Sequence, residues 1–185
     1  MSVLKKIVRQ CFLASLLACS TILLSAQTKI ASEYQIKAVF LFNFAQFVEW
    51  PATSFQETNA IVIGVLGDDP FGSYLDEAVR GEEVHGHPLI IQRYRHVEDV
   101  KACHILFISA TETHQLKHVF ISIKSRNILT VSDADNFTKQ GGIIRFITED
   151  RKTRIRINLN AAKNAELIIS SKLLRLAEVV NPQNN

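Results

Sequence analysis

The stretch of sequence that decides the fold runs from residue 127 to residue 180 and reads NILTVSDADNFTKQGGIIRFITEDRKTRIRINLNAAKNAELIISSKLLRLAEVV. Its first part predicts a buried strand at Ile128–Val131, followed by an Asp-rich loop. Apolar and polar residues then alternate from Gly142 to Thr148 and from Thr153 to Leu159. This period of two predicts an antiparallel hairpin with one face on a core and the other in water, with Glu149–Lys152 as its turn.

Helical spacing in the last part of this stretch predicts a C-terminal helix. Asn160 is a suitable N-cap, because its side-chain oxygen can accept a hydrogen bond from a backbone N–H of the first turn. An apolar face then recurs at helical spacing, formed by Leu167, Ile168, Leu173, Leu174, Leu176 and Val180. The polar residues 182–185 predict a flexible tail.

Strand and helix patterns alternate in the part of the chain that precedes the hairpin. Apolar runs at 60–66, 89–94 and 103–108 predict strands, and the segments 71–79, 97–100 and 113–124 have helical spacing. Asp69 would cap the first of these helices, with Pro70 at its first position. This alternation indicates right-handed βαβ crossovers. The sequence therefore predicts an α/β fold: a three-layer α/β/α sandwich with a mostly parallel Rossmann-like sheet and a C-terminal antiparallel hairpin.

An aromatic-rich helix is predicted between Ser32, which forms a capping box with Gln35, and Trp50–Pro51. Its inward stripe would consist of Ile36, Val39, Phe40, Phe44, Phe47 and Val48. The apolar surface is wider than this stripe, because it also includes Leu41 and Phe42. Two interpretations follow. Either the helix is wholly core, or part of it is a docking surface, for which Phe42 is the candidate partner-binding residue.

The first 26 residues have the organisation of an export signal. Three basic residues precede an apolar run from Cys11 to Leu24, and the small residue Ala26 precedes the expected cleavage site. The run is shorter than the roughly 20 residues of a membrane-spanning helix. The alternative is a lipoprotein modified at Cys19, although apolar residues rather than a polar tether follow it. We expect cleavage after Ala26 and one periplasmic, non-transmembrane domain at 27–181.

Removal of this segment changes the charge of the chain. The whole sequence has 21 basic and 18 acidic residues, and the first 26 residues contain three basic and no acidic ones, so 18 of each remain. A neutral chain has no electrostatic support for nucleic-acid binding. Because Cys11 and Cys19 lie within the signal, Cys103 is left without a partner for an internal disulfide. Its apolar neighbours predict a buried, unreactive thiol.

Ligands of open α/β sheets collect beyond the carboxyl ends of the parallel strands. The polar residues expected at these ends are candidate ligand-binding residues: Asp68, Asp69, Ser109, Asp133 and Asp135. Their carboxylates could bind a cation or a small basic solute. The alternative interpretation is that these residues cap helices and form turns, as Asp and Ser commonly do at such positions.

The motifs of common enzymes and cofactor sites are missing from the sequence. The segment Gly64–Gly67 is not the dinucleotide-binding GxGxxG, and there is no GxxxxGK[ST] or GxSxG. His85 with His87, and His114 with His118, have spacings that could offer two metal ligands, but neither pair has an evident third. We expect no enzyme activity, no cofactor and no metal site.

Three blocks of the sequence resemble the YfiR/HmsC-like family of periplasmic regulatory proteins. They are EYQIKAVFLFNFAQFVEWP at 33–51, IVIGVLGDDPFGSYLDEAV at 61–79, and SDADNF, QGGIIRF and RIRINLNAAKNAELIISSKLLRLA within 132–177. The resemblance implies a Rossmann-like fold and a regulator that is not an enzyme. Such a protein binds the periplasmic domain of an inner-membrane diguanylate cyclase and lowers cyclic-di-GMP signalling and biofilm formation.

Two other kinds of partner remain open from the sequence. One is a second copy of the chain, which would give a homodimer. The other is a small molecule, in which case the protein would be a periplasmic sensor or binding protein that serves a membrane histidine kinase or a transporter. Its site would then lie in the crevice near Asp68 and Asp133.

Overall fold

The computed structural model describes residues 33–150 and 152–181. Contacts divide the chain into two units, Met1–Tyr34 and Gln35–Asn185. Of the first unit only Glu33 and Tyr34 are described, and both are helical. The predicted export signal, the Cys19 alternative and the Ser32 cap therefore lie outside the described residues. Within the described ranges, no helix is both long enough and apolar enough to cross a membrane.

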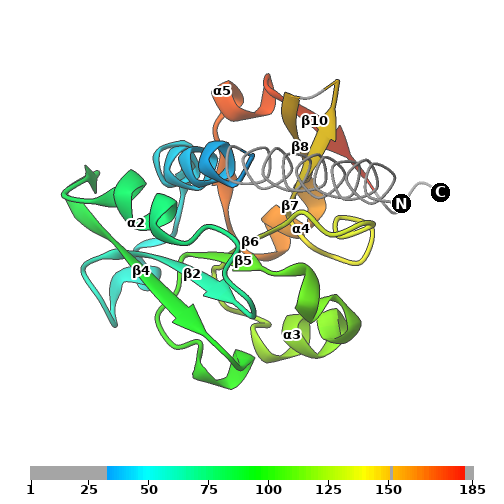
Figure 1. Cartoon of the computed structure of the whole chain (residues 1–185). Helices are drawn as coiled ribbons and strands as arrows, with labels where there is room; N and C mark the ends of the chain where they lie inside the picture. Colours follow the sequence, from blue (N-terminus) through cyan, green and yellow to red (C-terminus); the bar gives the residue numbers. More distant parts are fainter. Residues whose placement is uncertain (1–32, 151, 182–185) are drawn as a thin grey trace, which may run out of the picture. The chain divides into compact units, whose positions relative to one another are not determined.

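The second unit is built on an eight-stranded sheet with the order β10-β8-β7-β6-β5-β2-β4-β3 (Figure 1). Its strands are β2 Ile61–Leu66, β3 Glu83–Val84, β4 His87–Tyr94, β5 Ile105–Ile108, β6 Leu129–Ser132, β7 Ile144–Glu149, β8 Lys152–Asn158 and β10 Ala177–Val180. Strands β4, β2, β5 and β6 run parallel, as predicted, and the hairpin strand β7 also pairs parallel to β6. A separate antiparallel sheet pairs β1 (Val48–Glu49) with β9 (Ile168–Ile169).

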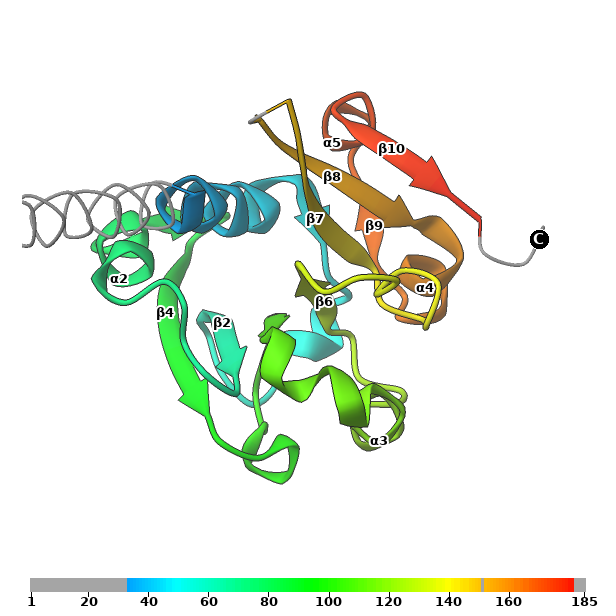
Figure 2. The same ribbon diagram turned by 45° about the vertical axis from the view of Figure 1, so that its right-hand side comes forward.

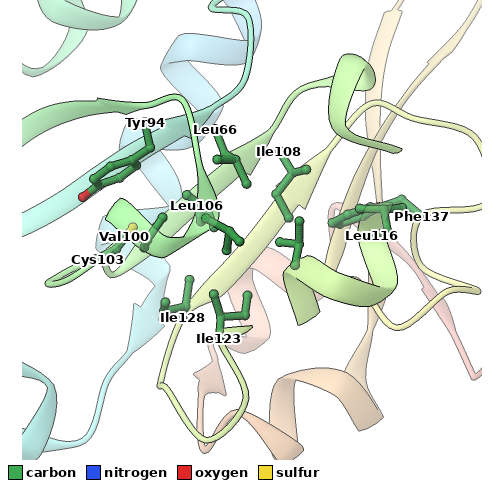
Figure 3. Close-up of a cluster of buried hydrophobic side chains, with 12 residues drawn as sticks. Leu66, Tyr94, Val100, Cys103, Leu106, Ile108, Leu116, Ile123, Ile128 and Phe137 are labelled. Atoms are coloured by element: carbon green, nitrogen blue, oxygen red, sulfur yellow. The ribbon is translucent and has the colours of Figure 1, made fainter. Parts of the chain in front are cut away.

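Apolar strands form the centre of the sheet because both of its faces are covered. Every residue of β2, β5 and β6 is buried. On one face, the helix at 35–47 packs Phe44 on Phe146 of β7, and Phe71 packs on Phe107 of β5 just before α2 (Ser73–Val79). On the other face, α3 (Leu116–Ser122) packs on β2 and β5 through a cluster that Figure 3 shows: Leu66, Leu106, Ile108, Leu116, Val119 and Ile123. Helices on both faces give the three predicted layers.

The predicted hairpin is formed by β7 and β8, which pair antiparallel from Ile144↔Ile157 to Glu149↔Lys152. The alternation placed its arms within one or two residues of the observed strands. Asp150, with a φ of 50°, lies in the turn. The edge strand β10, which the sequence did not predict, pairs parallel to β8.

The predicted C-terminal helix is wrong. The segment instead forms α4 (Leu159–Asn164), β9, α5 (Ser171–Leu174) and β10. Asn158 rather than Asn160 caps α4, because its side chain accepts a hydrogen bond from the N–H of Ala161 at 3.0 Å. The chain leaves the helical conformation at Glu166, where φ is 57°, and β9 then pairs with β1. Pairing with distant segments thus overrides the local helical spacing.

The inward face of the helix at 35–47 also differs from the prediction. Ile36 and Val39 are 46% and 50% exposed, so their predicted inward placement is wrong. Phe44 is buried as predicted, and the other buried positions are Lys37, Ala38, Leu41 and Ala45. Lys37 can occupy an inward position because its ammonium group lies 2.7 Å from the carboxylate of Asp133 in the loop after β6. Phe42 is half-buried at the margin of this face.

Two other helices begin differently from the prediction. Gly72 is the N-cap of α2, and the carboxylate of Asp69 instead accepts the N–H of Phe71 at 2.8 Å in the preceding turn. The helix predicted at 113–124 consists of the 3-10 helix η3 (Ala110–Gln115) followed by α3. Two further 3-10 helices are η1 (Ala52–Phe55) and η2 (Val97–Asp99), the second of which was predicted as a helical connection.

Candidate functional site

The five parallel strands follow the order of a flavodoxin-like sheet, so the switch point lies between β2 and β5. The loops that follow these two strands are in contact there. Gly67 has a φ of 85°, and a Cβ atom at this position would lie 2.7 Å from Cγ of Glu112. The N–H of Asp68 lies 3.5 Å from Oγ1 of Thr111. Side chains of the β5 loop therefore fill the space next to Gly67.

Asp69 belongs to a cluster of charges that fastens the β2 loop to α2 and β4. The guanidinium of Arg93 lies 2.7 Å from the Asp69 carboxylate and 2.6 Å from that of Asp76. It also donates a hydrogen bond to the carbonyl of Gly72 at 3.2 Å. The hydrogen bond from Arg93 holds the pKa of Asp76 below its ordinary value. In this arrangement Asp69 has a partner within the chain, as the turn-forming interpretation expects.

The remaining candidate ligand-binding residues are either buried or paired with a charged side chain of the chain. Ser109 is buried at 6% exposure and directly precedes η3. Asp133 is paired with Lys37, and Asp135 is paired with Arg145. The structure thus brings Asp68, Asp69 and Ser109 to neighbouring loops. For all five residues, including Asp133 and Asp135, a ligand-binding role stays a prediction.

The Ser132–Gly142 loop contains the family-like SDADNF and QGG residues and is held by its own side chains. Ser132 donates a hydrogen bond to the carbonyl of Ile108 at 2.7 Å. The Phe137 ring is fully buried against the backbone of Gly142, where an added Cβ atom would lie 2.2 Å from a ring carbon. Asn158 donates to the carbonyl of Thr138 at 3.0 Å. These residues fix the shape of the loop.

A cluster of the aromatic side chains Phe55, His87 and His104 covers the opposite end of the sheet, where the parallel strands begin. His104 is 1% exposed, and its Nδ1 accepts the N–H of Val62 at 3.1 Å. Nε2 therefore carries the proton of the neutral ring, and this atom has no hydrogen-bond partner within the described residues. The ring of Phe55 stacks between His104 and His87, with centroid distances of 4.7 and 4.1 Å. Burial lowers the pKa of His104 to about 4.

We expect His104 to make the protein less stable in mild acid. Its pKa in the folded state is about 4, below the ordinary value of 6.5, so the unfolded chain binds a proton first. The contribution of neutral His104 to the free energy of unfolding is therefore fully present at neutral pH. This contribution is lost as the pH falls from about 6.5 towards 4, and the loss amounts to at most about 3 kcal/mol. The check is urea denaturation at a series of pH values.

The matched variant for this measurement is His104→Asn, because an amide oxygen can replace Nδ1 as the acceptor but does not titrate. Its stability should change less between pH 7 and pH 4.5 than that of the unmodified protein. His118→Asn is the control, since His118 is more than half exposed beside Glu98. Identical pH profiles for the unmodified protein and His104→Asn would contradict the prediction.

The other predicted features of histidine and cysteine can now be placed. Nδ1 of His114 lies 2.8 Å from the carbonyl of Thr111, and His118 lies 3.5 Å from Glu98. Over the ranges that the structure describes, no group of three or more His, Cys, Asp or Glu side chains is arranged to hold a metal ion. Cys103 is buried, and burial raises the pKa of its thiol to about 12, which confirms the predicted buried thiol.

Sequence reasoning did not find a cleft of about 710 Å³ between α3, the Gln140–Ile143 segment and α4. None of the five predicted ligand-binding residues lies in its lining. The cleft is formed by segments that are far apart in the sequence, so no local motif reports it. The sequence does contain one signal of the cleft: the basic residues Lys124, Arg126 and Lys139 lie at the end of a predicted helix or in predicted loops.

Comparison with known proteins places these features in a family. A family model described as YfiR/HmsC-like matches residues 34–178. No curated protein matches the chain. The chain is similar to the crystal structure of a conserved domain protein from Vibrio cholerae O1 biovar El Tor str. N16961, with 13% sequence identity, a TM-score of 0.49 and coverage of 65% of this chain. It spans 55% of the length of that structure.

Proposed function

Because the chain belongs to the YfiR/HmsC-like family, we propose that it is a periplasmic negative regulator of an inner-membrane diguanylate cyclase. It binds the periplasmic domain of the cyclase and lowers cyclic-di-GMP signalling without catalysing a reaction itself. The observation that carries this proposal is the family match, which extends over residues 34–178. The match includes both the aromatic helix and the hairpin that were recognised in the sequence.

The surface of the helix at 35–47 supports a role in binding a protein. Ile36 and Val39 lie one helical turn apart and are both about half exposed, at 46% and 50%. Phe42 is half-buried at the margin of the packed face of the same helix. Large apolar side chains at the surface contribute much of the affinity when a partner covers them. We place the contact with the cyclase on this helix, with Phe42 as its candidate residue.

Phe42→Ala is expected to weaken regulation while the fold remains. Truncation of a half-buried ring at the margin of the core should cost about 1 kcal/mol, near the centre of the range for single substitutions. The matched control is Phe44→Ala on the same helix, because Phe44 is fully buried and stacks on Phe146. Its loss should be about 3 to 5 kcal/mol. Thermal melts and cellular cyclic-di-GMP measurements together separate the two variants.

In cells, Phe42→Ala should accumulate normally in the periplasm and raise cyclic-di-GMP towards the level of a deletion strain. If Phe42→Ala unfolds as readily as Phe44→Ala, the helix is wholly core and the contact lies elsewhere. If it folds and regulates normally, Phe42 is not a contact residue, and Ile36→Lys with Val39→Lys becomes the next variant for locating the contact.

The proposed function itself is tested by deletion and cross-linking. Deleting the gene should raise cyclic-di-GMP, and restoring it should lower cyclic-di-GMP again. Cross-linking in intact cells, followed by purification from solubilised inner membranes, should recover a protein with a diguanylate cyclase domain. Unchanged cyclic-di-GMP on deletion, in cells that produce the protein, would overturn the proposal.

A further inference from the structure

The cleft between α3 and α4 is large enough to hold a small molecule. Its volume is about 710 Å³, and small-molecule sites commonly have volumes of roughly 300 to 1,000 Å³. It lies on the same face of the sheet as the buried cluster of α3, and the two helices on either side of it can be followed in Figure 2. Phe120, Ala161 and Ala165, which are all partly exposed, contribute apolar surface to its lining.

The charged residues of the lining are all basic. Lys124, Arg126 and Lys139 line the cleft, and no aspartate or glutamate does so. The ion pairs found within the described ranges involve other cations, so none of the three is in direct ion-pair contact with a carboxylate of these ranges. Arg126 is oriented by a hydrogen bond that it donates to the carbonyl of Val100 at 2.6 Å. This excess of positive charge favours an anion and disfavours a cation.

Amide groups surround the same opening and can add directional hydrogen bonds. Gln140, Asn160 and Asn164 lie in the lining with the basic residues. An amide offers two donors and one acceptor oxygen, so it can bind a carboxylate or phosphate oxygen through its NH₂ group. An inorganic anion alone would leave the apolar surface at Phe120, Ala161 and Ala165 uncovered. The combination of both surfaces is suited to an organic anion with an apolar body.

The walls of the cleft are held in place before a ligand arrives. The Phe137–Gly142 contact fixes the loop that carries Lys139 and Gln140. Thr130 accepts the N–H of Ile143 at 3.0 Å, which attaches the end of this loop to β6. A site of fixed shape loses less conformational entropy when it binds a ligand than one that must be ordered.

We propose that this cleft binds a small organic anion. Its carboxylate or phosphate group is held by Lys124, Arg126 and Lys139, and its apolar part packs on Phe120, Ala161 and Ala165. The proposal does not depend on the proposed cyclase partner, because binding is measured on the purified protein alone. It also differs from a site at the carboxyl ends of the strands, whose acidic side chains would favour a cation.

The experiment is calorimetric titration with four probes that each contain eight carbon atoms and differ in their polar end group. Octanoate and octyl phosphate should bind with one molecule per cleft. Octanol and octylammonium should bind about tenfold more weakly or not at all, which corresponds to the loss of one charge-assisted hydrogen bond. The proposal is overturned if the two anions fail to bind, or if octanol binds as tightly as octanoate.

A charge-reversed pair of variants locates the binding. Lys124→Glu with Lys139→Glu should weaken octanoate binding by about tenfold or more. The control is Lys117→Glu with Lys172→Glu, which changes the net charge equally at two exposed lysines outside the lining and should bind as the unmodified protein does. All four substituted lysines are exposed, so both proteins should fold, and a melting curve confirms it. Equal binding by the two double variants would overturn the assignment to this cleft.

Discussion

Gly142→Ala is expected to destabilise the protein by about 3 kcal/mol, at the upper end of what overpacking costs in a core. The added Cβ atom would lie 2.2, 2.3 and 2.5 Å from three carbons of the Phe137 ring. These distances are far below van der Waals contact, and the ring is fully buried, so it has no open space into which to move. The loop must therefore separate from the sheet. Urea denaturation of the purified variant gives the loss directly.

Two further proteins distinguish this collision from a general effect of replacing glycine. Gly81→Ala introduces the same methyl group where nothing lies within 4 Å, at a φ of 74°, so only backbone strain of about 1 kcal/mol is expected. Phe137→Leu removes the ring atoms that Gly142→Ala would meet. Combining the two substitutions should cost less than the sum of the single losses. Strict additivity would show that the ring does not cause the effect.

The same contact explains why the QGG residues could be recognised in the sequence but not interpreted. A pattern of Gly and aromatic residues indicates a tightly packed turn, but it does not say which ring meets which glycine. Phe137 and Gly142 meet because the loop closes on itself between β6 and β7. The conformation of this loop also depends on Asn158, the last residue of β8, which donates a hydrogen bond to the carbonyl of Thr138.

The central parallel strands and the hairpin were the predictable part of the fold. Apolar runs such as Ile61–Leu66 are buried on both faces, and the alternation in β7 and β8 follows directly from one covered face. These patterns are local, and the sequence reports them. The segment 161–180 also carries a strong helical pattern, yet Ile168 and Ile169 pair with β1, which lies more than 100 residues earlier in the sequence. Single-sequence periodicity contains no information on such a pairing.

The candidate site was predicted less well for a related reason. Asp68, Asp69, Ser109, Asp133 and Asp135 were identified as polar residues at strand ends, and the structure does place them in the loops that follow the strands. Their partners could not be predicted, because Arg93, Lys37 and Arg145 come from other elements. The basic cleft was missed because its cations are divided between the turn after α3 and the Phe137–Gly142 loop.

Lys37→Ala should cost about 3 kcal/mol, because it breaks a buried ion pair from one side only. The side chain of Lys37 is 4% exposed and its ammonium group lies 2.7 Å from the carboxylate of Asp133, which is 15% exposed. Truncation would leave the Asp133 charge in a poorly solvated position beneath the helix at 35–47. It would also remove the contact of the lysine with the Phe146 ring, whose centroid is 5.9 Å from Nζ. Chemical denaturation measures the loss.

The double variant Lys37→Met with Asp133→Asn tests whether the charge left behind is the cause. Both charges are then absent, and an apolar chain of similar length fills the space of the lysine, so the loss should be much smaller than for Lys37→Ala. Lys152→Ala, at an exposed lysine of β8, is the control and should change stability by less than about 0.5 kcal/mol. If the single and double variants are equally unstable, the attraction within the ion pair matters more than the charge left behind, because methionine preserves the packing of the lysine chain. If the double variant is nearly as stable as the unmodified protein, the charge left on Asp133 accounts for the loss in Lys37→Ala.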